Sequence, residues 1–188
     1  MRKKFPSVKF EVDPQTLAHP TLAFLRGYWD DKRRGRTMPA RTDIKASELK
    51  EHLPWIVMVD VLPGLADFRY RLIGTLVTEY FRTDATGKTV SQAWAEQGEE
   101  GVEGNLAVFR QVAESRRPFF LYGESDWNTI GLEEFQCLYL PLSDDGENVN
   151  VILHAFVFDR RPVLLARQIA RDKQAKYLSV SRHQADGD

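Results

Sequence analysis

The sequence has one cysteine in 188 residues, and it has neither a long apolar run nor a marked excess of charge of one sign. Cys137 alone cannot form an internal disulfide bond or supply a cysteine zinc cluster, which fits a reducing cytoplasm. No stretch approaches the roughly 18 apolar residues of a membrane span, and no apolar stretch follows the basic residues 1–6 as in a secretory signal. We therefore expect a single cytoplasmic globular domain without a membrane span.

Motifs for common chemistry are also missing. The sequence has no glycine-rich phosphate loop, no Gly-x-Ser-x-Gly elbow and no His-Glu-x-x-His motif. Its four histidines are too far apart to form a local metal site. These absences predict a protein that is not an enzyme and that holds no metal from local sequence.

The charge is nearly balanced, with 26 Lys+Arg against 27 Asp+Glu, so a chain-wide basic footprint for nucleic acid is excluded. The basic side chains nevertheless gather at the ends. Residues 160–188 hold seven basic and three acidic residues, and residues 1–9 hold four basic residues and no acidic one. We expect a flexible basic segment over residues 1–19 and a basic tail over residues 161–188. These ends are either solvated or used for docking an acidic partner or membrane surface.

The periodicity of apolar residues predicts an α+β fold. Apolar residues at helical spacing predict helices over residues 21–34, 46–52, 76–81, 91–96 and 100–115. Alternating or β-branched runs predict strands over residues 55–62, 68–72, 118–123, 133–142 and 148–159. This order predicts a five-stranded antiparallel sheet with the helices gathered on one side. The N-terminal helix would cover the other face or contact a partner.

Several local motifs resemble a known family. The stretch 70–75 looks like a PAS-domain strand that leads into the first crossover helix, and residues 84–87 resemble the Asp-x-Thr-Gly turn of many PAS sequences. Further upstream, the resemblance is carried by Tyr28, Trp29, Arg33, Gly35, Met38-Pro39-Ala40-Arg41, Asp43, Leu49, Leu53-Pro54 and Asp60. Over residues 20–160 the chain resembles short stand-alone PAS proteins, which are found mostly in alphaproteobacteria. One departure is Phe81-Arg82-Thr83, where that family usually has a glycine.

The resemblance implies a function without chemistry of its own. A PAS-type sensory or regulatory module would bind a small ligand or a protein partner and signal in trans. It would form a homodimer through the N-terminal helix, with predicted contacts from Leu22, Leu25, Tyr28 and Trp29. Two alternatives remain open: a ligand-free adaptor protein, and an enzyme with Asp60, Arg71 and His154 as its polar centre.

In a PAS fold, the space between the crossover helices and the sheet can hold a small apolar or aromatic molecule. The predicted pocket residues are Trp94, Phe109, Tyr122, Tyr139, His154 and Arg71. His154 is either a hydrogen-bonded histidine of the sheet or a polar group in this pocket. Haem is disfavoured, because PAS haem sensors usually take their ligand from the crossover and residues 75–116 contain no His or Cys. Flavin photochemistry is disfavoured too, since Cys137 lies outside any Asn-Cys-Arg-type motif and reads as a small buried hydrophobe.

Two polar features have structural and functional interpretations. Asp60 interrupts an apolar strand, so we expect it to pair with Arg69 or Arg71 across a hairpin. The stretch 38–43 is stiffened by Pro39 and contains two charged side chains that can hydrogen-bond in a turn. It would either brace the N-terminal helix on the sheet or bind a partner.

Overall fold

The computed structural model of the chain describes residues 8–10, 17, 19–125 and 133–159. The chain divides into two compact units, Met1–Phe158 and Asp159–Asp188. The predicted basic tail, residues 161–188, lies outside the described residues, as does most of the predicted basic segment 1–19. All described residues except Asp159 belong to the first unit.

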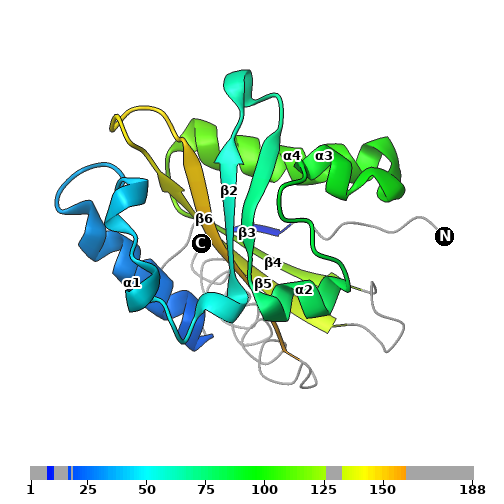
Figure 1. Cartoon of the computed structure of the whole chain (residues 1–188), viewed down its shortest axis with the longest axis horizontal. Helices are drawn as coiled ribbons and strands as arrows, with labels where there is room; N and C mark the ends of the chain where they lie inside the picture. The colour runs from blue at the N-terminus through cyan, green and yellow to red at the C-terminus, as the bar shows by residue number, and fades with distance from the viewer. Residues whose placement is uncertain (1–7, 11–16, 18, 126–132, 160–188) are drawn as a thin grey trace, which may run out of the picture. The chain divides into compact units, whose positions relative to one another are not determined.

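The centre of this unit is a sheet of six strands in the order β1-β4-β5-β6-β2-β3 (Figure 1). The strands are β1 (Val8–Phe10), β2 (Ile56–Val61), β3 (Phe68–Ile73), β4 (Phe119–Ser125), β5 (Glu133–Leu142) and β6 (Val151–Asp159). The five predicted strands are confirmed, and so is the α+β class. The sixth strand, β1, pairs antiparallel with β4 at the sheet edge, where the sequence predicted a loosely attached extended segment.

The helices are α1 (Pro20–Arg33), α2 (Thr75–Phe81), α3 (Val90–Ala93) and α4 (Gly98–Ser115). Pro20 stands in the first turn of α1, where its missing N–H costs nothing, and the His19 side chain caps the helix. The helix predicted over residues 46–52 is wrong. Within that range only Ala46–Glu48 forms a 3-10 turn, and a second 3-10 turn, Leu53–Trp55, follows it. Pro54 in the second turn cannot continue an α-helix and restricts the residue before it.

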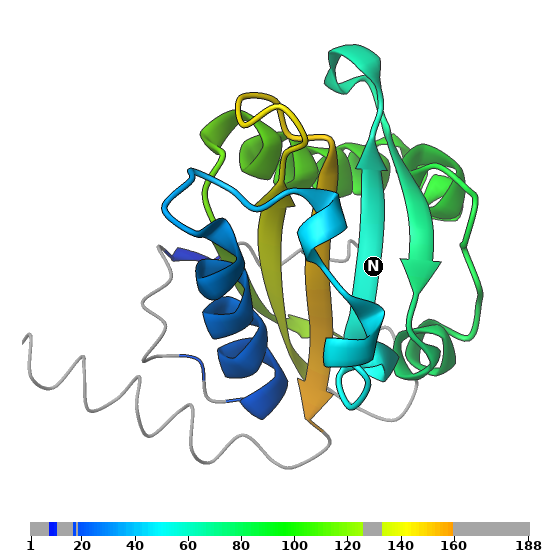
Figure 2. The ribbon, with the colours of Figure 1, turned by 60° about the vertical axis from the view of Figure 1, so that its left-hand side comes forward.

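The helices cover both faces of the sheet (Figures 1 and 2). Helix α1 lies against one face, and α2, α3 and α4 lie against the other. Strand alternation supplies each face with its own apolar side chains: in β6, Leu153 and Ala155 point one way while His154 and Phe156 point the other. We refer to these as the α1 face and the α4 face.

A close approach of two backbones connects the elements at the end of β3. Gly74 donates a hydrogen bond to the Ile56 carbonyl and begins α2. A Cβ atom at this position would lie 2.3 Å from the carbonyl oxygens of Leu53 and Pro54. Glycine is therefore required here by space, since its backbone φ of −66° is open to any residue.

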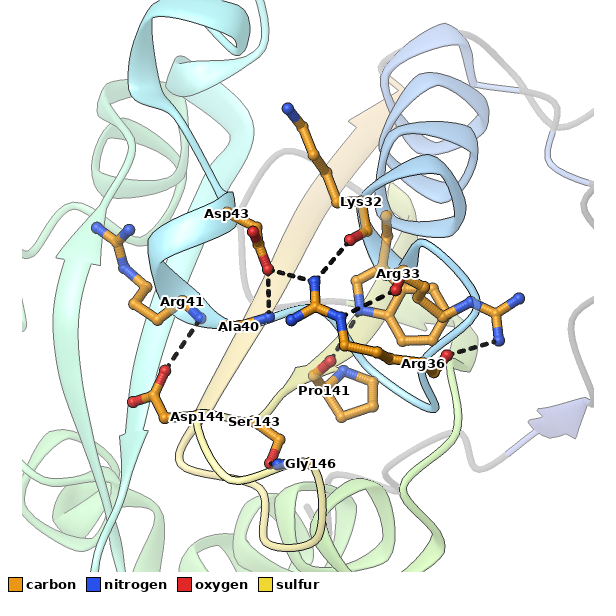
Figure 3. Close-up of polar contacts among 11 residues, drawn as sticks. Lys32, Arg33, Arg36, Ala40, Arg41, Asp43, Pro141, Ser143, Asp144 and Gly146 are labelled. Atoms are coloured by element: carbon orange, nitrogen blue, oxygen red, sulfur yellow. Dashed lines mark hydrogen bonds and ion pairs between the residues drawn. The ribbon is translucent and has the colours of Figure 1, made fainter.

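The α1 face is held by polar contacts around the stretch 38–43 (Figure 3). The Asp43 carboxylate accepts the Ala40 N–H at 2.8 Å and the Arg36 guanidinium at 2.6 Å. Arg36 also donates to the carbonyls of Lys32 and Arg33 in the last turn of α1. The Arg36 and Ala40 hydrogen bonds lower the pKa of Asp43. The stretch is thus tied to the end of α1.

The same stretch is tied to the β5–β6 hairpin. Ser143 donates its N–H to the Pro39 carbonyl at 3.0 Å, and the Arg41 N–H reaches the Asp144 carboxylate at 3.3 Å. Trp29 of α1, 2% exposed, donates its indole N–H to the Pro141 carbonyl of β5 at 2.8 Å. These contacts support the interpretation of residues 38–43 as a brace between α1 and the sheet.

Candidate functional site

A cavity of about 460 Å³ lies on the α4 face, between the sheet and helices α2 to α4. Its buried floor is formed by Val57, Tyr70, Val77, Phe109, Phe135, Cys137, Tyr139, His154 and Phe156. Its exposed rim carries Thr83, Glu96, Gln97, Gly104, Ala107 and Gln111. The volume falls within the range of small-molecule pockets, and an apolar floor with a polar rim is their usual composition.

The strands place the floor residues through their alternation and register. Residues 135, 137 and 139 of β5 point to the α4 face, as do residues 154 and 156 of β6. His154 stands opposite Val57 of β2 in the antiparallel register, near the centre of the sheet. The strand residues of the floor therefore form a continuous patch on four neighbouring strands, β5, β6, β2 and β3.

The turn over residues 84–87 fixes the side of the cavity next to β3. Asp84 accepts the Thr86 N–H at 2.9 Å, and hydrogen bonds from the side chain and the backbone of Thr86 lower the pKa of Asp84. Gly87, at φ +86°, donates its N–H to the Tyr70 carbonyl at 2.7 Å. A positive φ favours glycine, so the Asp-x-Thr-Gly sequence fits the turn it forms. Ala85 of this turn lines the cavity.

At residues 81–83, where the sequence lacks the glycine usual in the resembled family, the backbone still has a conformation that favours glycine. Arg82 ends α2 in the left-handed conformation, with φ +55° and ψ +26°. Glycine is the usual residue for this conformation at a helix C-terminus. The backbone thus keeps a shape suited to glycine even though an arginine occupies the position, and Thr83 still lines the cavity.

His154 is the most unusual group in the cavity floor. It is 6% exposed, and within the described part of the chain neither of its ring nitrogens has a hydrogen-bond partner. The Tyr139 ring stacks on it at 4.8 Å and an interplanar angle of 21°, and Phe109 meets it edge-on at 5.8 Å. Burial lowers the pKa of His154 to about 3, so the ring is neutral at pH 7. A buried polar group without a partner is costly, so this one requires an explanation, such as a bound water, ion or ligand.

Other polar groups of the floor already have partners. The Trp94 indole N–H donates to the Tyr70 hydroxyl at 3.0 Å, and burial raises the pKa of Tyr70 to about 12. Tyr139 hydrogen-bonds to Cys137, and burial raises the pKa of both groups. The Cys137 thiol is therefore fully protonated near pH 7 and lacks the thiolate character of a reactive cysteine.

The cavity contains four of the six predicted pocket residues: Trp94, Phe109, Tyr139 and His154. Tyr122 and Arg71 are not among the described residues that line it. Tyr122 differs from Phe119 and Leu121 in its parity along β4, so its side chain leaves from the opposite face. Arg71 is exposed and pairs with Asp60 across the β2–β3 hairpin at 2.7 Å.

This Arg71–Asp60 pair confirms the predicted partner of Asp60, and it also separates the two residues from His154. The three side chains proposed as the polar centre of an enzyme are therefore not brought together. Sequence reasoning missed much of the cavity wall, including Val57, Val77, Phe81, Phe119, Leu121, Phe135 and Phe156. For the residues on strands, the alternation shows which side chains of one strand share a face, and the register between strands decides which face meets the cavity.

The predicted dimer contacts occupy the domain's own interior. Leu22 and Leu25 are 0% exposed and Trp29 is 2% exposed, all within the core between α1 and the sheet. Tyr28 is half-buried and donates its hydroxyl to the Glu48 carboxylate at 2.6 Å. The α1 stripe thus serves first as a cover for the sheet, and Phe24, 39% exposed, is the large apolar side chain it leaves at the surface.

Across the described residues, no group of three or more His, Cys, Asp or Glu side chains is placed to hold a metal ion. A search for membrane spans over the same residues found no helix with the length and apolar character to cross a bilayer.

Comparison with known proteins assigns the class. A PAS domain family model matches residues 17–156, which is most of the chain and includes the sheet from β2 to β6, the helices and the cavity. The chain belongs to the PAS domain family, whose members are in general sensory modules without enzymatic activity. A search of curated proteins found no match.

Among solved structures, an RNA-binding light-oxygen-voltage receptor is similar over 78% of this chain and 40% of that chain, with 12% identity and a TM-score of 0.47. This chain thus spans about two fifths of that protein's length. A light-oxygen-voltage domain studied with a flavin analogue matches 69% of this chain and 93% of that chain, at 11% identity and a TM-score of 0.43. The PAS domain of Bordetella pertussis BvgS has the same coverage, 16% identity and a TM-score of 0.41.

Proposed function

We propose that this PAS domain is a sensory or regulatory module whose signal is a small organic molecule bound in the cavity on the α4 face. It performs no chemistry on this molecule and acts in trans on a protein partner. The observation that carries the proposal is His154, a neutral imidazole that is buried at the cavity floor and has no partner among the described residues. A bound molecule supplies that partner.

The size and lining of the cavity support a ligand. A volume of about 460 Å³ is far beyond a packing defect, since interiors are close-packed and voids larger than a water molecule are few. Rim residues such as Gln97 and Gln111 are exposed, so the cavity has access to solvent. A ligand-free adaptor would need neither the volume nor the access.

Trp94 and Tyr70 offer a route from the ligand to the surface. Their hydrogen bond joins α3 to β3, and both side chains line the cavity. A ligand that shifts Trp94 moves α3, which is short and lies next to the exposed rim. The partner would then recognise the altered position of α3 or α4, or dock through α1 or the basic tail.

The ligand can be tested by native mass spectrometry of freshly purified protein. We expect the wild-type chain to carry an additional small-molecule mass. Ala107→Phe places a ring at the exposed rim and should abolish that mass, whereas Ala23→Phe, at an exposed position of α1 away from the cavity, should retain it. A wild-type spectrum without bound mass, together with no binding of added aromatic compounds, would favour the adaptor.

A homodimer in the cytoplasm completes the proposal. Because Leu25 is buried in the domain's own core, Leu25→Glu would unfold the chain and cannot test a dimer. Phe24→Glu is the suitable change, since Phe24 is exposed on α1 and its ring stacks on the rings of Tyr28 and His52 and not in the core. Sedimentation should show a dimer for the wild type and monomers for Phe24→Glu; equal masses for the two would remove α1 from the interface.

A further inference from the structure

The walls of the cavity favour a flat apolar molecule. Aromatic rings enter it from both the helices and the sheet: among them, Trp94 follows α3, Phe109 belongs to α4, Tyr139 to β5 and Phe156 to β6. The Tyr139 ring stacks on the His154 ring at 4.8 Å with an interplanar angle of 21°, so the orientation of these two rings in the cavity floor is fixed. Planar aromatic ligands stack on such rings and bury a large apolar area without losing internal freedom.

The charges around the cavity argue for an uncharged ligand. Among the described residues that line it, none is Lys or Arg, and the single charged one is Glu96 at the exposed rim. A carboxylate or phosphate placed at the floor would be buried without an opposite charge, which is strongly unfavourable. The buried part of the ligand must therefore be neutral.

His154 supplies the polar contact of the floor. Tyr70 is engaged with Trp94 and Tyr139 with Cys137, whereas both nitrogens of His154 lack a partner among the described residues. A neutral imidazole has one nitrogen that donates and one that accepts. A hydroxyl group satisfies either nitrogen, because it can donate to one or accept from the other.

Building on the proposed function, we propose that the ligand is an uncharged aromatic molecule with a hydroxyl group that hydrogen-bonds to His154. The aromatic body fills the space between α4 and the sheet. The hydroxyl selects against plain hydrocarbons of the same shape, which leave His154 unpaired, and the neutral floor selects against aromatic acids.

Three probes of similar shape test this: 2-naphthol, naphthalene and 2-naphthoate, titrated into the full chain at pH 7. We expect 2-naphthol to bind about tenfold more tightly than naphthalene, the effect of one buried hydrogen bond. We expect 2-naphthoate to bind at least about a hundredfold more weakly than 2-naphthol. In His154→Phe the preference for 2-naphthol over naphthalene should fall below about twofold. The matched substitution His52→Phe, outside the cavity, should keep the full preference.

A second measurement on the wild-type chain guards against misfolding of His154→Phe. The imidazole ¹⁵N signals of His154 should shift on addition of 2-naphthol and stay nearly unchanged with naphthalene. Equal binding of 2-naphthol and naphthalene, tight binding of 2-naphthoate, or unshifted His154 signals would each overturn the inference and leave the ligand-binding function standing. Absence of binding by all three probes would overturn both.

Discussion

On the α1 face, Trp29 donates to the backbone of β5, and Asp43 joins Arg36 to the N–H of Ala40, so hydrogen bonds tie the helix and the brace to the sheet. On the α4 face, the sheet carries equally apolar strands, yet a cavity of about 460 Å³ remains and His154 has no partner among the described residues. One face is packed and hydrogen-bonded by a helix of the chain, and the other holds the cavity in which we propose that a ligand binds. The α1 face therefore contributes to folding stability through its hydrogen bonds, whereas the α4 face loses stability at the cavity and at His154.

The largest expected effect comes from the backbone junction beneath both faces. Gly74→Ala would bring a Cβ against the carbonyl oxygens of Leu53 and Pro54, and backbone cannot move aside cheaply. We expect a loss of about 4 kcal/mol in the free energy of unfolding, measured by urea denaturation. Gly27→Ala in α1, where nothing lies within 4 Å of the new Cβ, should instead gain up to about 1 kcal/mol. Similar effects for the two changes would mean that the junction yields.

The second effect belongs to the α4 face and depends on pH. The pKa of His154 is lowered to about 3 by burial, against 6.5 for an unperturbed histidine. As the pH falls below 6.5, His154 therefore binds a proton in the unfolded chain and not in the folded chain. The contribution of His154 to the free energy of unfolding is thus present above pH 6.5 and is lost as the pH falls below it. Between pH 7 and 5 this amounts to about 2 kcal/mol.

The measurement is the pH dependence of urea unfolding for the wild type and His154→Phe. The variant should show a shallower decline between pH 7 and 5, by about one proton taken up on unfolding. A bound uncharged ligand stabilises the folded form at both pH values and should leave that slope in place. Superimposable profiles for the two proteins would mean that His154 titrates normally in the folded state.

The third effect probes the brace on the α1 face. Asp43→Ala removes the acceptor of the Ala40 N–H and the partner of Arg36, and we expect a loss of about 1 kcal/mol. Ligand affinity should be unchanged, because Asp43 lies on the other face of the sheet. Asp31→Ala, a removal of the same charge at an exposed position in α1, is the control and should change stability by less than about 0.5 kcal/mol. A weakened ligand affinity in Asp43→Ala would show that the two faces are coupled.

The smallest effect is a gain. Arg82→Gly places glycine where the backbone already has φ +55°, and should add about 0.5–1 kcal/mol to the stability. Thermal unfolding is a suitable measurement. Arg69→Gly in β3, at an ordinary strand position, should lower the stability. A loss in Arg82→Gly as well would show that the arginine side chain itself holds the turn.

The main elements were predictable because their apolar residues follow clear periods. The alternation over residues 68–72 gave β3, and the stripe along residues 100–115 gave α4 within two residues. Strand β1 was not predicted, because three residues are too few to show a period and the strand is defined by its pairing with β4. The 3-10 turn at Ala46–Glu48 was predicted as the start of an α-helix over residues 46–52, because apolar spacing alone does not separate the two geometries.

The cavity was predictable in kind and only partly in detail. Trp94, Phe109 and Tyr139 were expected to line it from the resemblance to PAS domains, and all three do. The errors have a common cause, since Tyr122 and Arg71 belong to strands whose facing depends on register, which sequence alone leaves undetermined. The sequence could not predict that the ring nitrogens of His154 lack a hydrogen-bond partner, because this depends on the hydrogen bonds that every neighbouring group makes.

The turn over residues 84–87 also affects how the sheet can meet other chains. β3 is an edge strand, and its outer side is occupied where Gly87 and Lys88 exchange hydrogen bonds with Tyr70 and where Arg69 bridges Thr89. An incoming strand would have to peel this turn away before it could extend the sheet there. Ala85, in the same turn, is part of the cavity wall. Protection against strand addition and part of the cavity wall thus depend on one short segment, so a change that opens the turn would affect both.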